Sequence, residues 1–365
     1  MSGMRIVHTE SSLGWGGQEI RILSESKGLI GRRHDVTVLC PAEARLFEEA
    51  PAWGVPAVAV PIAKKRPRGL RALLDWFRRN PCDVVSTHSS TDAWLAALAL
   101  LILGRPFPMV RTRHISAPVP TNAATRWLYT RATARIVTTG EALKRELVER
   151  NRFTGVRIDS VPTGADPERY RPGDQRAARA ALGLPAERPL VGIVATLRSW
   201  KGHLFLIDAV AGLPASVGLV IVGEGPMRPK LERRVDERGI RERTVFAGNQ
   251  ADVVPWLQAL DVFALPSYAN EGVPQALIQA MLAGLPCVTT RVGSVGELAQ
   301  PGETALVVPA QDADALREAI ASLLEDAALS ARLGAAARRH CVAGYSYQAM
   351  LDRMEQVYRE ASGST

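Results

Sequence analysis

Cysteine is scarce in this sequence, and none of its spacings marks a cysteine-based site. The four cysteines, Cys40, Cys82, Cys287 and Cys341, lie far apart, with no CxxC or CxH pair among them. A structural zinc site needs closely spaced cysteines and histidines, and a small secreted domain that depends on disulfides is much richer in cysteine. We therefore expect reduced thiols and no metal site.

Targeting and membrane-spanning segments are also missing. The opening residues, MSGMRIVHTE, contain no basic stretch followed by an apolar one, so no signal peptide is evident. The longest apolar run, residues 93–103, is about 11 residues long, well short of the ~20 that a membrane-spanning helix needs. We expect a cytoplasmic protein that is bound at most to the surface of a membrane.

Several catalytic signatures have no counterpart either. There is no HExxH, paired carboxylate, Ser-His-Asp order or P-loop, which argues against most hydrolases and kinases. The segment from Val222 to Arg228, VGEGPMR, approaches a dinucleotide fingerprint, but Arg228 stands where the last glycine of GxGxxG is required. A nicotinamide or flavin dinucleotide is therefore not expected.

The charges that are present are unevenly distributed. Residues 1–170 carry 25 basic and 16 acidic side chains, a net charge of +9, whereas the remainder carries −1. A basic half favours an anionic partner. Lysine is rare, with six in the chain, so each lysine near a candidate site is more informative than usual.

Short β-branched runs alternate with amphipathic stretches, which predicts parallel sheets with helices on both faces. Residues 161–172 interrupt this rhythm with three prolines and a glycine, a stiff linker. The predicted strands lie at 5–8, 36–39, 84–87, 109–112 and 135–138 before the linker and at 190–195, 217–222, 244–247, 262–265, 287–290 and 306–308 after it. We expect an α/β chain of two Rossmann-like domains, whose strand ends, where such sheets bind ligands, face each other across a cleft.

The most informative cluster of residues follows the predicted strand 262–265. A polar loop leads through Glu271 into a helix that is expected to start near Val273 and Pro274, since proline suits a first helical turn. The backbone N–H groups of Gly272 and Val273 would then form an anion-binding helix terminus, and Glu271 could accept hydrogen bonds from sugar hydroxyls. Gln279 is two turns further along the same face. Taken singly, each of these residues is also compatible with an ordinary polar surface.

Two further loops have the chemistry of phosphate binding. Arg198 and Lys201 follow the predicted strand 190–195, where a guanidinium fork and an ammonium group suit a diphosphate. Gly16 and Gly17 follow the first strand and allow close backbone approach to a phosphate, although glycine-rich first loops are common.

His88 and His114 each directly follow a predicted strand of the first half. A lone histidine is most often structural. Two histidines at the carboxyl ends of parallel strands make a role in the cleft about as plausible as a structural one.

Taken together, these segments resemble the GT-B retaining glycosyltransferases of family 4 along essentially the whole chain. The resemblance rests on Gly16–Glu19 (GGQE), His114, the linker, the Arg198/Lys201 pair, Val222–Pro226 and the E-x7-E element at 271–279. It implies an N-terminal acceptor domain (1–170), a C-terminal donor domain (171–345) and a last helix (346–365) that packs back on the first domain.

The resemblance also implies roles for individual residues. Gly16 and Gly17 approach the donor diphosphate, and Arg198 and Lys201 neutralise it as it leaves. Glu271, with the backbone of Gly272, Val273 and Pro274, holds the donor sugar and phosphate, while Gly248, Asn249 and Gln250 lie where the base docks. His114 lies beside the reacting sugar. Glu297 matches another acidic position whose role we do not assign.

The chain departs from the family at Gln279, which replaces the second glutamate of E-x7-E. That carboxylate accepts hydrogen bonds from the ribose in the family, and a neutral hydrogen bond contributes about 0.5–1.5 kcal/mol against about 1.5–3 for a charged one. We expect a weaker or differently tuned nucleotide grip.

The cleft segments contain no DxD motif, so cationic side chains and a helix terminus would replace a metal ion, and no cofactor is expected besides the nucleotide-sugar substrate. No nucleophile is clearly placed, which favours front-face displacement, with Glu271 as a covalent nucleophile less favoured. The expected function is hexosyl transfer from a nucleotide diphosphate sugar, UDP favoured over GDP, to a glycan or lipid-linked acceptor in surface polysaccharide or lipopolysaccharide synthesis.

Two alternatives remain open. One is a GT-B 2-epimerase or an inverting transferase, in which His88 or His114 could act as a base. The other is a non-catalytic nucleotide-sugar-binding subunit. Nucleic acid is not expected as a partner.

Residues 64–79 combine seven basic side chains with a helical apolar face of Leu70, Leu73, Leu74 and Phe77. The leucines alone would fit an ordinary helix packed on its sheet, but the crowded positive charge would not be explained. Because many members of the family act on lipid-linked intermediates, we expect peripheral binding to anionic membranes.

Overall fold

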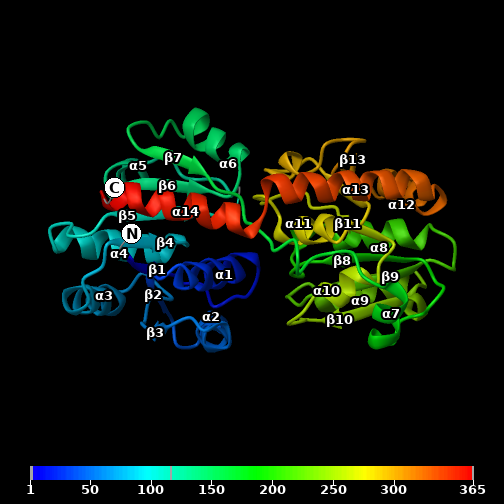
Figure 1. Cartoon of the computed structure of the whole chain (residues 1–365), viewed down its shortest axis with the longest axis horizontal. Helices are drawn as coiled ribbons and strands as arrows, with labels where there is room; N and C mark the ends of the chain where they lie inside the picture. The colour runs from blue at the N-terminus through cyan, green and yellow to red at the C-terminus, as the bar shows by residue number, and fades with distance from the viewer. Residues whose placement is uncertain (1–2, 116, 364–365) are drawn as a thin grey trace. The chain divides into compact units, whose positions relative to one another are not determined.

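The computed structural model describes residues 3–115 and 117–363, and its chain forms two compact units (Figure 1). Unit 1 consists of Met1–Pro162 and Ala349–Thr365, and unit 2 of Thr163–Gln348. The chain therefore enters unit 2 earlier than residue 170, because the linker contacts unit 2: Ala165 pairs with Ser346, and Arg338 donates to the carbonyl of Tyr170.

Unit 1 is built on a seven-stranded, wholly parallel sheet of order β3-β2-β1-β4-β5-β6-β7. Ile6 is in register with Val36 on one side and with Val84 on the other. The strands are β1 (Arg5–Thr9), β2 (Asp35–Cys40), β3 (Ala57–Ala59), β4 (Val84–Thr87), β5 (Met109–Arg113), β6 (Arg135–Thr138) and β7 (Arg157–Ser160). The helices are α1 (Gly17–Gly31), α2 (Arg45–Glu49), α3 (Pro67–Arg79), α4 (Ser90–Ile102), α5 (Ala123–Thr130), α6 (Glu141–Arg145), its π-helical continuation Glu146–Arg150, and α14 (Tyr347–Ser362).

Unit 2 repeats this architecture with a six-stranded parallel sheet of order β10-β9-β8-β11-β12-β13. Its strands are β8 (Leu190–Val194), β9 (Gly218–Val222), β10 (Thr244–Gly248), β11 (Val262–Leu265), β12 (Cys287–Thr290) and β13 (Leu306–Val308). Its helices are α7 (Gln175–Leu182), α8 (His203–Ala211), α9 (Arg228–Glu237), α10 (Val254–Gln258), α11 (Gln275–Leu282), α12 (Ala313–Glu325) and α13 (Ala327–Gly344). The two units confirm the predicted class of paired Rossmann-like domains.

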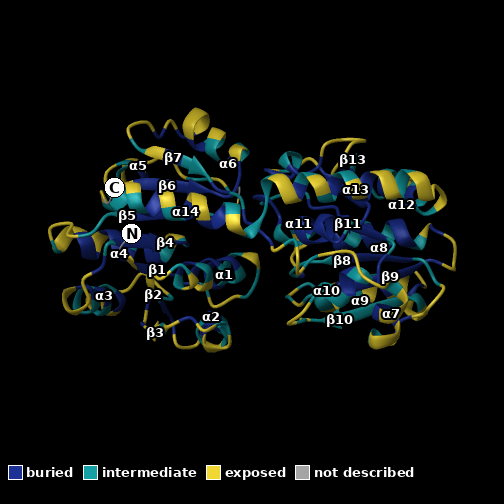
Figure 2. Ribbon diagram, in the orientation of Figure 1, coloured by how far each residue is buried: buried dark blue, intermediate teal, exposed yellow. Residues whose placement is uncertain are grey.

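Burial follows the layers of each unit. The central strands are the most deeply buried segments, whereas the edge strands β3, β7, β10 and β13 are only partly buried, and most exposed positions lie on helices and loops (Figure 2). The four cysteines are buried and none forms a disulfide, as expected. Within the described part of the chain, no helix combines the length and apolar content needed to cross a bilayer.

Every predicted strand is present, but the sequence analysis did not predict β3 and β7. Both are short edge strands, and β7 carries Arg157 and Asp159, which lack the apolar pattern of a buried strand. Between β8 and α8 the chain forms a short 3₁₀ turn, Ser199–Lys201, and α8 begins after Gly202.

The C-terminal helix α14 is fastened to unit 1 by a buried polar cluster. The Tyr358 hydroxyl donates to Glu25 Oε1 at 2.6 Å and lies 3.0 Å from Ser86 Oγ. Glu25 is in turn 3.5 Å from Arg21 Nε, and both side chains are fully buried. Because groups this deep have no access to water, each depends on its protein partners.

Replacing Tyr358 with phenylalanine removes only this hydroxyl. We expect the change to destabilise the packing of α14 on unit 1 by about 1–3 kcal/mol, the usual effect of leaving buried partners unsatisfied. Native-state hydrogen exchange of the α14 amides measures this directly. Tyr268→Phe is the matched control, since within the described residues Tyr268 hydrogen-bonds through its backbone N–H and not through its hydroxyl. Equal exchange in the two variants would show that the cluster does not hold α14.

Candidate active site

The candidate residues gather where the strand order reverses in each sheet. In unit 2 the reversal falls between β8 and β11, and in unit 1 between β1 and β4. Loops that leave such neighbouring strands turn in opposite directions and leave a crevice at the carboxyl ends. Arg198 and Lys201 follow β8, Glu271 follows β11, and in unit 1 Gly16 and Gly17 follow β1, His88 follows β4 and His114 follows β5.

Lys201 and Glu271 form the central contact of the unit 2 site. Lys201 Nζ is 2.7 Å from Glu271 Oε1, and the hydroxyl of Ser267 donates to the same oxygen at 2.6 Å. The Glu271 side chain is 5% exposed and that of Lys201 18%. The pair thus places one largely buried cation and one buried carboxylate at the end of the sheet.

Glycines allow the loops around this pair to touch. Gly202 has a φ of +79°, and a Cβ there would lie 1.9 Å from the Pro266 carbonyl oxygen. At Gly223, which has a φ of +136°, a Cβ would lie 2.0 Å from the Ala195 carbonyl oxygen. No other residue fits either position, so the loops after β8, β9 and β11 form one packed surface.

Arg198 is the second cation of the β8 loop. It is exposed, its guanidinium lies 6.0 Å from the Trp200 ring centroid, and it has no carboxylate partner among the described residues. His203, just beyond Lys201, is buried. Burial and the charge of Lys201 lower the pKa of His203 to about 3, so this ring is neutral. Positive charge at the loop therefore resides on Arg198 and Lys201.

The start of α11 differs in detail from the expectation. The helix begins at Gln275 and Pro274 occupies the N-cap, one position earlier than the first turn. Gly272, Val273 and Pro274 are all buried beside Glu271.

Gln279 lies in the middle of α11 and is 7% exposed. Its amide nitrogen donates to the Tyr170 hydroxyl at 3.0 Å. With the nitrogen engaged in this way, the carbonyl oxygen is the part of the side chain that is left for a ligand.

Gly248, Asn249 and Gln250 close the edge of the same site. Gly248 is the last residue of β10, and Asn249 and Gln250 follow it. The Gly248 carbonyl accepts a hydrogen bond from Gly223 N at 2.8 Å. Gln250 Nε2 donates to the Ala247 carbonyl. The structure therefore brings these residues to the same sheet edge as Arg198, Lys201 and Glu271, on consecutive strands β10-β9-β8-β11.

Three imidazoles form a chain at the carboxyl edge of the unit 1 sheet. His8 Nδ1 lies 2.9 Å from His88 Nε2, and His88 Nδ1 lies 3.0 Å from His114 Nε2. Burial lowers the pKa of all three, aided for His88 by its two histidine neighbours. His88 and His114, which the sequence could not relate, are thus hydrogen-bonded neutral rings.

A buried carboxyl cluster supports the glycine-rich loop. Glu10 accepts from Ser89 Oγ at 2.5 Å and from Ser12 N at 2.7 Å, and Gln18 Nε2 also donates to it. Burial, together with the nearby Asp92, raises the pKa of Glu10 to about 8. Burial likewise raises the pKa of Asp92 to about 6, against the hydrogen bond from His88 N and the charge of Arg111.

Gly16 is the N-cap of α1 and Gly17 its first residue, so the loop from Glu10 leads directly into this helix terminus. Gln18, one residue later, ties the terminus to Glu10 and Ser89.

Sequence reasoning missed His8, Glu10, Ser89, Asp92 and Ser267. For His8 the signal was a polar residue inside the predicted buried strand 5–8, whereas Glu10, Ser89, Asp92 and Ser267 lie outside the predicted strands, where polar residues are ordinary. Among residues 3–115 and 117–363, no group of three or more histidine, cysteine or acidic side chains could hold a metal ion.

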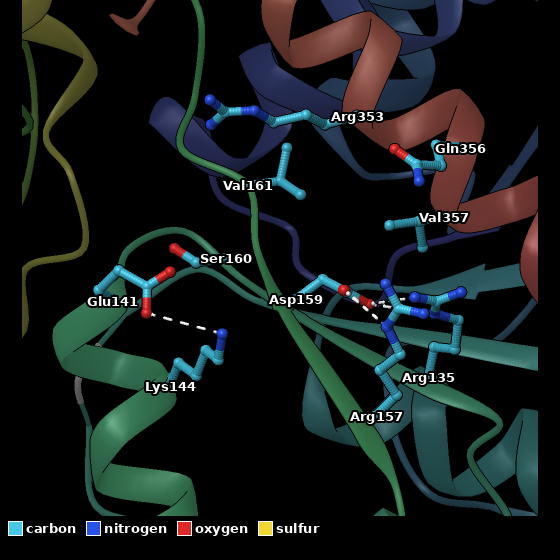
Figure 3. A pocket seen from close by; sticks show the side chains of 10 residues that line it. All are labelled: Arg135, Glu141, Lys144, Arg157, Asp159, Ser160, Val161, Arg353, Gln356 and Val357. Carbon is cyan, nitrogen blue, oxygen red and sulfur yellow. Dashed lines mark hydrogen bonds and ion pairs between the residues drawn. The ribbon is translucent and has the colours of Figure 1, made fainter.

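A pocket of about 250 Å³ lies elsewhere in unit 1 and contains none of the candidate residues (Figure 3). Figure 3 shows Arg135 and Arg157 converging on Asp159, at 2.9 and 3.2 Å, and Lys144 beside Glu141. Most of its cations are therefore neutralised by neighbouring carboxylates, so we do not assign the site to this pocket.

The sequence and the structure are similar to known proteins. Residues 15–169 match the family model Glycosyltransferase Family 4, and residues 174–340 match Glycosyl transferases group 1. The D-inositol 3-phosphate glycosyltransferase of Mycolicibacterium paratuberculosis is 31% identical over 303 residues, which are 76% of this chain and 67% of that protein.

Two solved structures are similar over nearly the whole chain. Anabaena HepE in complex with UDP-glucose has a TM-score of 0.88 at 21% identity, covering 98% of this chain and 100% of that one. WaaG, a glycosyltransferase involved in lipopolysaccharide biosynthesis, has a TM-score of 0.75 at 18% identity with the same coverage. These likenesses confirm the GT-B fold.

The buried acid Glu10 gives a prediction about pH. Because its pKa is raised from 4.5 to about 8, the folded protein holds a proton that the unfolded chain releases, so stability falls as the pH rises through that interval. Glu10→Gln has no such proton, and its stability relative to wild type should increase between about pH 5 and pH 9, by at most about 5 kcal/mol. Thermal unfolding across this range measures the difference.

The matched control is Glu43→Gln, which removes an exposed acid from the same unit. The stability of Glu43→Gln should change with pH in the same way as that of wild type. A parallel curve for Glu10→Gln as well would show that Glu10 is ionised in the folded protein.

Proposed function

The chain belongs to the group 1, family 4 glycosyltransferases, and on that premise we propose that it is a retaining, metal-independent hexosyltransferase. In this proposal it transfers a sugar from a nucleotide diphosphate sugar to a glycan or lipid-linked acceptor. The contact that carries the proposal is the Lys201–Glu271 pair at the reversal point of the unit 2 sheet, with the exposed guanidinium of Arg198, which has no carboxylate partner among the described residues, in the same loop.

The two cations have the chemistry that a departing diphosphate requires. Negative charge grows on the leaving phosphate as its bond to the sugar breaks, and preorganised cations stabilise that charge most where water is excluded. Lys201 is held in place by Glu271, whereas Arg198 is exposed and can fold over a ligand. Together they would supply the positive charge that other transferases take from a metal ion.

Glu271 is placed to hold the donor sugar. One of its oxygens already accepts from Lys201 and Ser267, so hydroxyl groups of a sugar would bind its second oxygen. In a front-face displacement, the acceptor oxygen bonds to the anomeric carbon as the bond to the diphosphate breaks. The acceptor proton passes to the leaving phosphate, so neither Glu271 nor a histidine has to act as a base or as a covalent nucleophile. Anomeric analysis of the product by NMR distinguishes this reaction from an inverting one.

The nucleotide would lie along α11 and the end of β10. We propose that the Gln279 carbonyl accepts from the ribose, since its amide nitrogen is engaged by Tyr170. UDP is favoured as carrier because HepE, which shares the fold, was solved with UDP-glucose. A thermal-shift panel of nucleotide sugars tests this choice, because a ligand at 100 times its Kd stabilises by ~2.7 kcal/mol.

The acceptor is proposed more broadly, as a glycan or a lipid-linked sugar at the inner face of the membrane. The names of similar proteins point to different acceptors, an inositol phosphate in one case and lipopolysaccharide in another. Surface polysaccharide or lipopolysaccharide synthesis fits a basic acceptor domain, since both kinds of acceptor carry negative charge.

The surface of unit 1 supports a membrane contact, but not through the apolar face of α3. Leu73 and Phe77 are buried in the core, with Leu70 and Leu74 packed beside them. Exposed apolar side chains occur instead on the neighbouring α4, where Leu101 is 44% exposed. Leu98 and Ile102 are the other two exposed apolar residues of α4, at 37% and 58%.

One cation of the basic segment 64–79 contacts α4 next to this stripe. Lys65 Nζ lies 5.6 Å from the ring centroid of Trp94, one turn before Leu98 on the same helix face. The chain has no acidic residue between Glu49 and Asp75 or between Asp92 and Glu141. Cations next to exposed apolar side chains, without competing acids, are what an anionic bilayer surface binds.

Lys201→Ala tests the role of the leaving-group cation. We expect kcat/KM to fall by at least ~10², the usual effect of removing one charge-stabilising donor. Lys230→Ala, which removes an exposed lysine of the same unit, should be neutral. Because Lys201→Ala leaves Glu271 buried without its cation, the double variant with Glu271→Gln should regain stability but not rate. Full activity of Lys201→Ala, or complete loss of wild-type activity in EDTA, contradicts the proposal.

Vesicle co-sedimentation tests the membrane contact. Wild type should bind anionic vesicles at low salt, each basic residue contributing up to ~1 kcal/mol, and release them as salt rises. Binding should fall when Lys64, Lys65, Arg66 and Arg68 are changed to serine, and also when Leu101 and Ile102 are. The control changes four exposed cations of unit 2 to serine: Arg171, Lys230, Arg233 and Arg339. If wild type stays in the supernatant, the acceptor is soluble and the basic surface serves another partner.

A further inference from the structure

The chain of three histidines couples the protonation of rings far apart in the sequence. His8 is fully buried and His88 is 4% exposed, so neither can touch a ligand directly. His114, the last of the three, is partly exposed at the carboxyl edge of the sheet. Each ring is neutral and therefore has one N–H and one lone pair.

Only two arrangements of hydrogens satisfy both contacts. In the first, His8 Nδ1–H donates to His88 Nε2, His88 Nδ1–H donates to His114 Nε2, and His114 has its hydrogen on Nδ1. In the second, both bonds are reversed: His114 Nε2–H donates to His88, His88 Nε2–H donates to His8, and His8 has its hydrogen on Nε2.

The His8 end of the histidine chain decides between the two arrangements. His8 Nε2 is buried and has no hydrogen-bond partner within the described residues. In the first arrangement this atom carries a lone pair, and in the second an N–H group. Buried N–H groups without an acceptor are rarer than buried acceptors without a donor, so the first arrangement is favoured.

The charged groups around the three histidines do not reverse the preference for the first arrangement. Glu25 favours a proton on His8, but the neighbouring Arg21 opposes it, and the two form an ion pair. On the other elements packed against the chain, the charged or titratable groups are Tyr358 of α14, Asp92 of α4, and Arg111 and Arg113 of β5. Arg21, and after it Arg111 for His88 and Arg113 for His114, disfavours an additional proton on these two rings.

We propose that His8 and His88 are positioning residues that hold His114 as the neutral tautomer with its hydrogen on Nδ1. His114 then meets a substrate as a hydrogen-bond donor to a sugar oxygen, and has no lone pair with which to take a proton from the acceptor. This inference rests on the proposed function for the identity of the ligand, and it separates the retaining reaction from an inverting one in which His114 is the base.

The tautomer can be observed without any activity assay. In protein labelled with ¹⁵N-histidine, two-bond ¹H–¹⁵N correlation at neutral pH distinguishes the two nitrogens of each ring, and His114→Gln identifies the His114 signals by their loss. We expect a protonated Nδ1 and an unprotonated Nε2. A protonated Nε2 on His114 overturns the proposal, whether or not glycosyl transfer is detected.

Variants of His88 test the coupling. His88→Leu removes the donor to His114 Nε2, and we expect mixed His114 tautomers and a kcat about tenfold lower, the equivalent of one hydrogen bond. In His88→Asn the amide nitrogen takes the place of Nδ1, and both the tautomer and, within about threefold, kcat should be restored. A wild-type tautomer in His88→Leu overturns the proposal.

Tyr358→Phe is the matched control, since it removes a buried hydroxyl whose ring lies edge-on to His8 and leaves the three imidazoles untouched. It should leave the His114 tautomer unchanged. If it alters the tautomer as His88→Leu does, the effect comes from general loosening of the unit and not from the histidine chain.

Discussion

The reversal of strand order in a parallel sheet is the constraint on which the candidate residues of each unit depend. In unit 2 the chain moves from β8 outward to β9 and β10, and then returns to place β11 on the other side of β8. The loops after β8 and β11 therefore leave neighbouring strands in opposite directions and bring together Lys201 and Glu271, 70 residues apart in the sequence. The contact is possible only because Gly202 allows the backbone to approach Pro266.

Burial affects the ionisable groups of the two units in different ways. In unit 2, Lys201 and Glu271 are close enough to stabilise each other as an ion pair. In unit 1, Glu10 and the three histidines have no partner of opposite charge within hydrogen-bonding distance, and the low polarity around them favours their neutral forms. The first arrangement suits the stabilisation of a departing anion. The second suits directional hydrogen bonding to neutral hydroxyl groups.

The polar residues of unit 1 also connect the site to the C-terminal helix. His8 occupies β1, where its ring stands edge-on to Tyr358 of α14, and Tyr358 contacts Ser86 on β4. The same two strands lead into the glycine-rich loop and into His88. The stability of α14 and the geometry of the histidine chain therefore share one layer of buried side chains.

By itself, the sequence determined the local chemistry and its place along the chain. Alternating β-branched and amphipathic runs indicated every central strand, and Arg198, Lys201, Glu271, His88 and His114 were recognised because each follows a predicted strand. The sequence did not indicate edge strand β3 because it is only three residues long and largely exposed, nor edge strand β7 because Arg157 and Asp159 interrupt its apolar pattern. The sequence did not indicate His8, Glu10 and Ser267 as site residues, because the role of a polar residue in or beside a strand depends on neighbours that only the fold brings together.

Only the tertiary structure decided which of these residues meet. The Lys201–Glu271 pair, the three-histidine chain and the Gln279–Tyr170 contact each join residues from different strands or loops, at separations that no spacing rule predicts. It also decided protonation, because the pKa of a carboxyl or imidazole depends on how deeply the fold buries it and on which charges lie beside it. The sequence specifies the residue types, but their partners and charge states depend on which strands lie next to each other in the folded sheets.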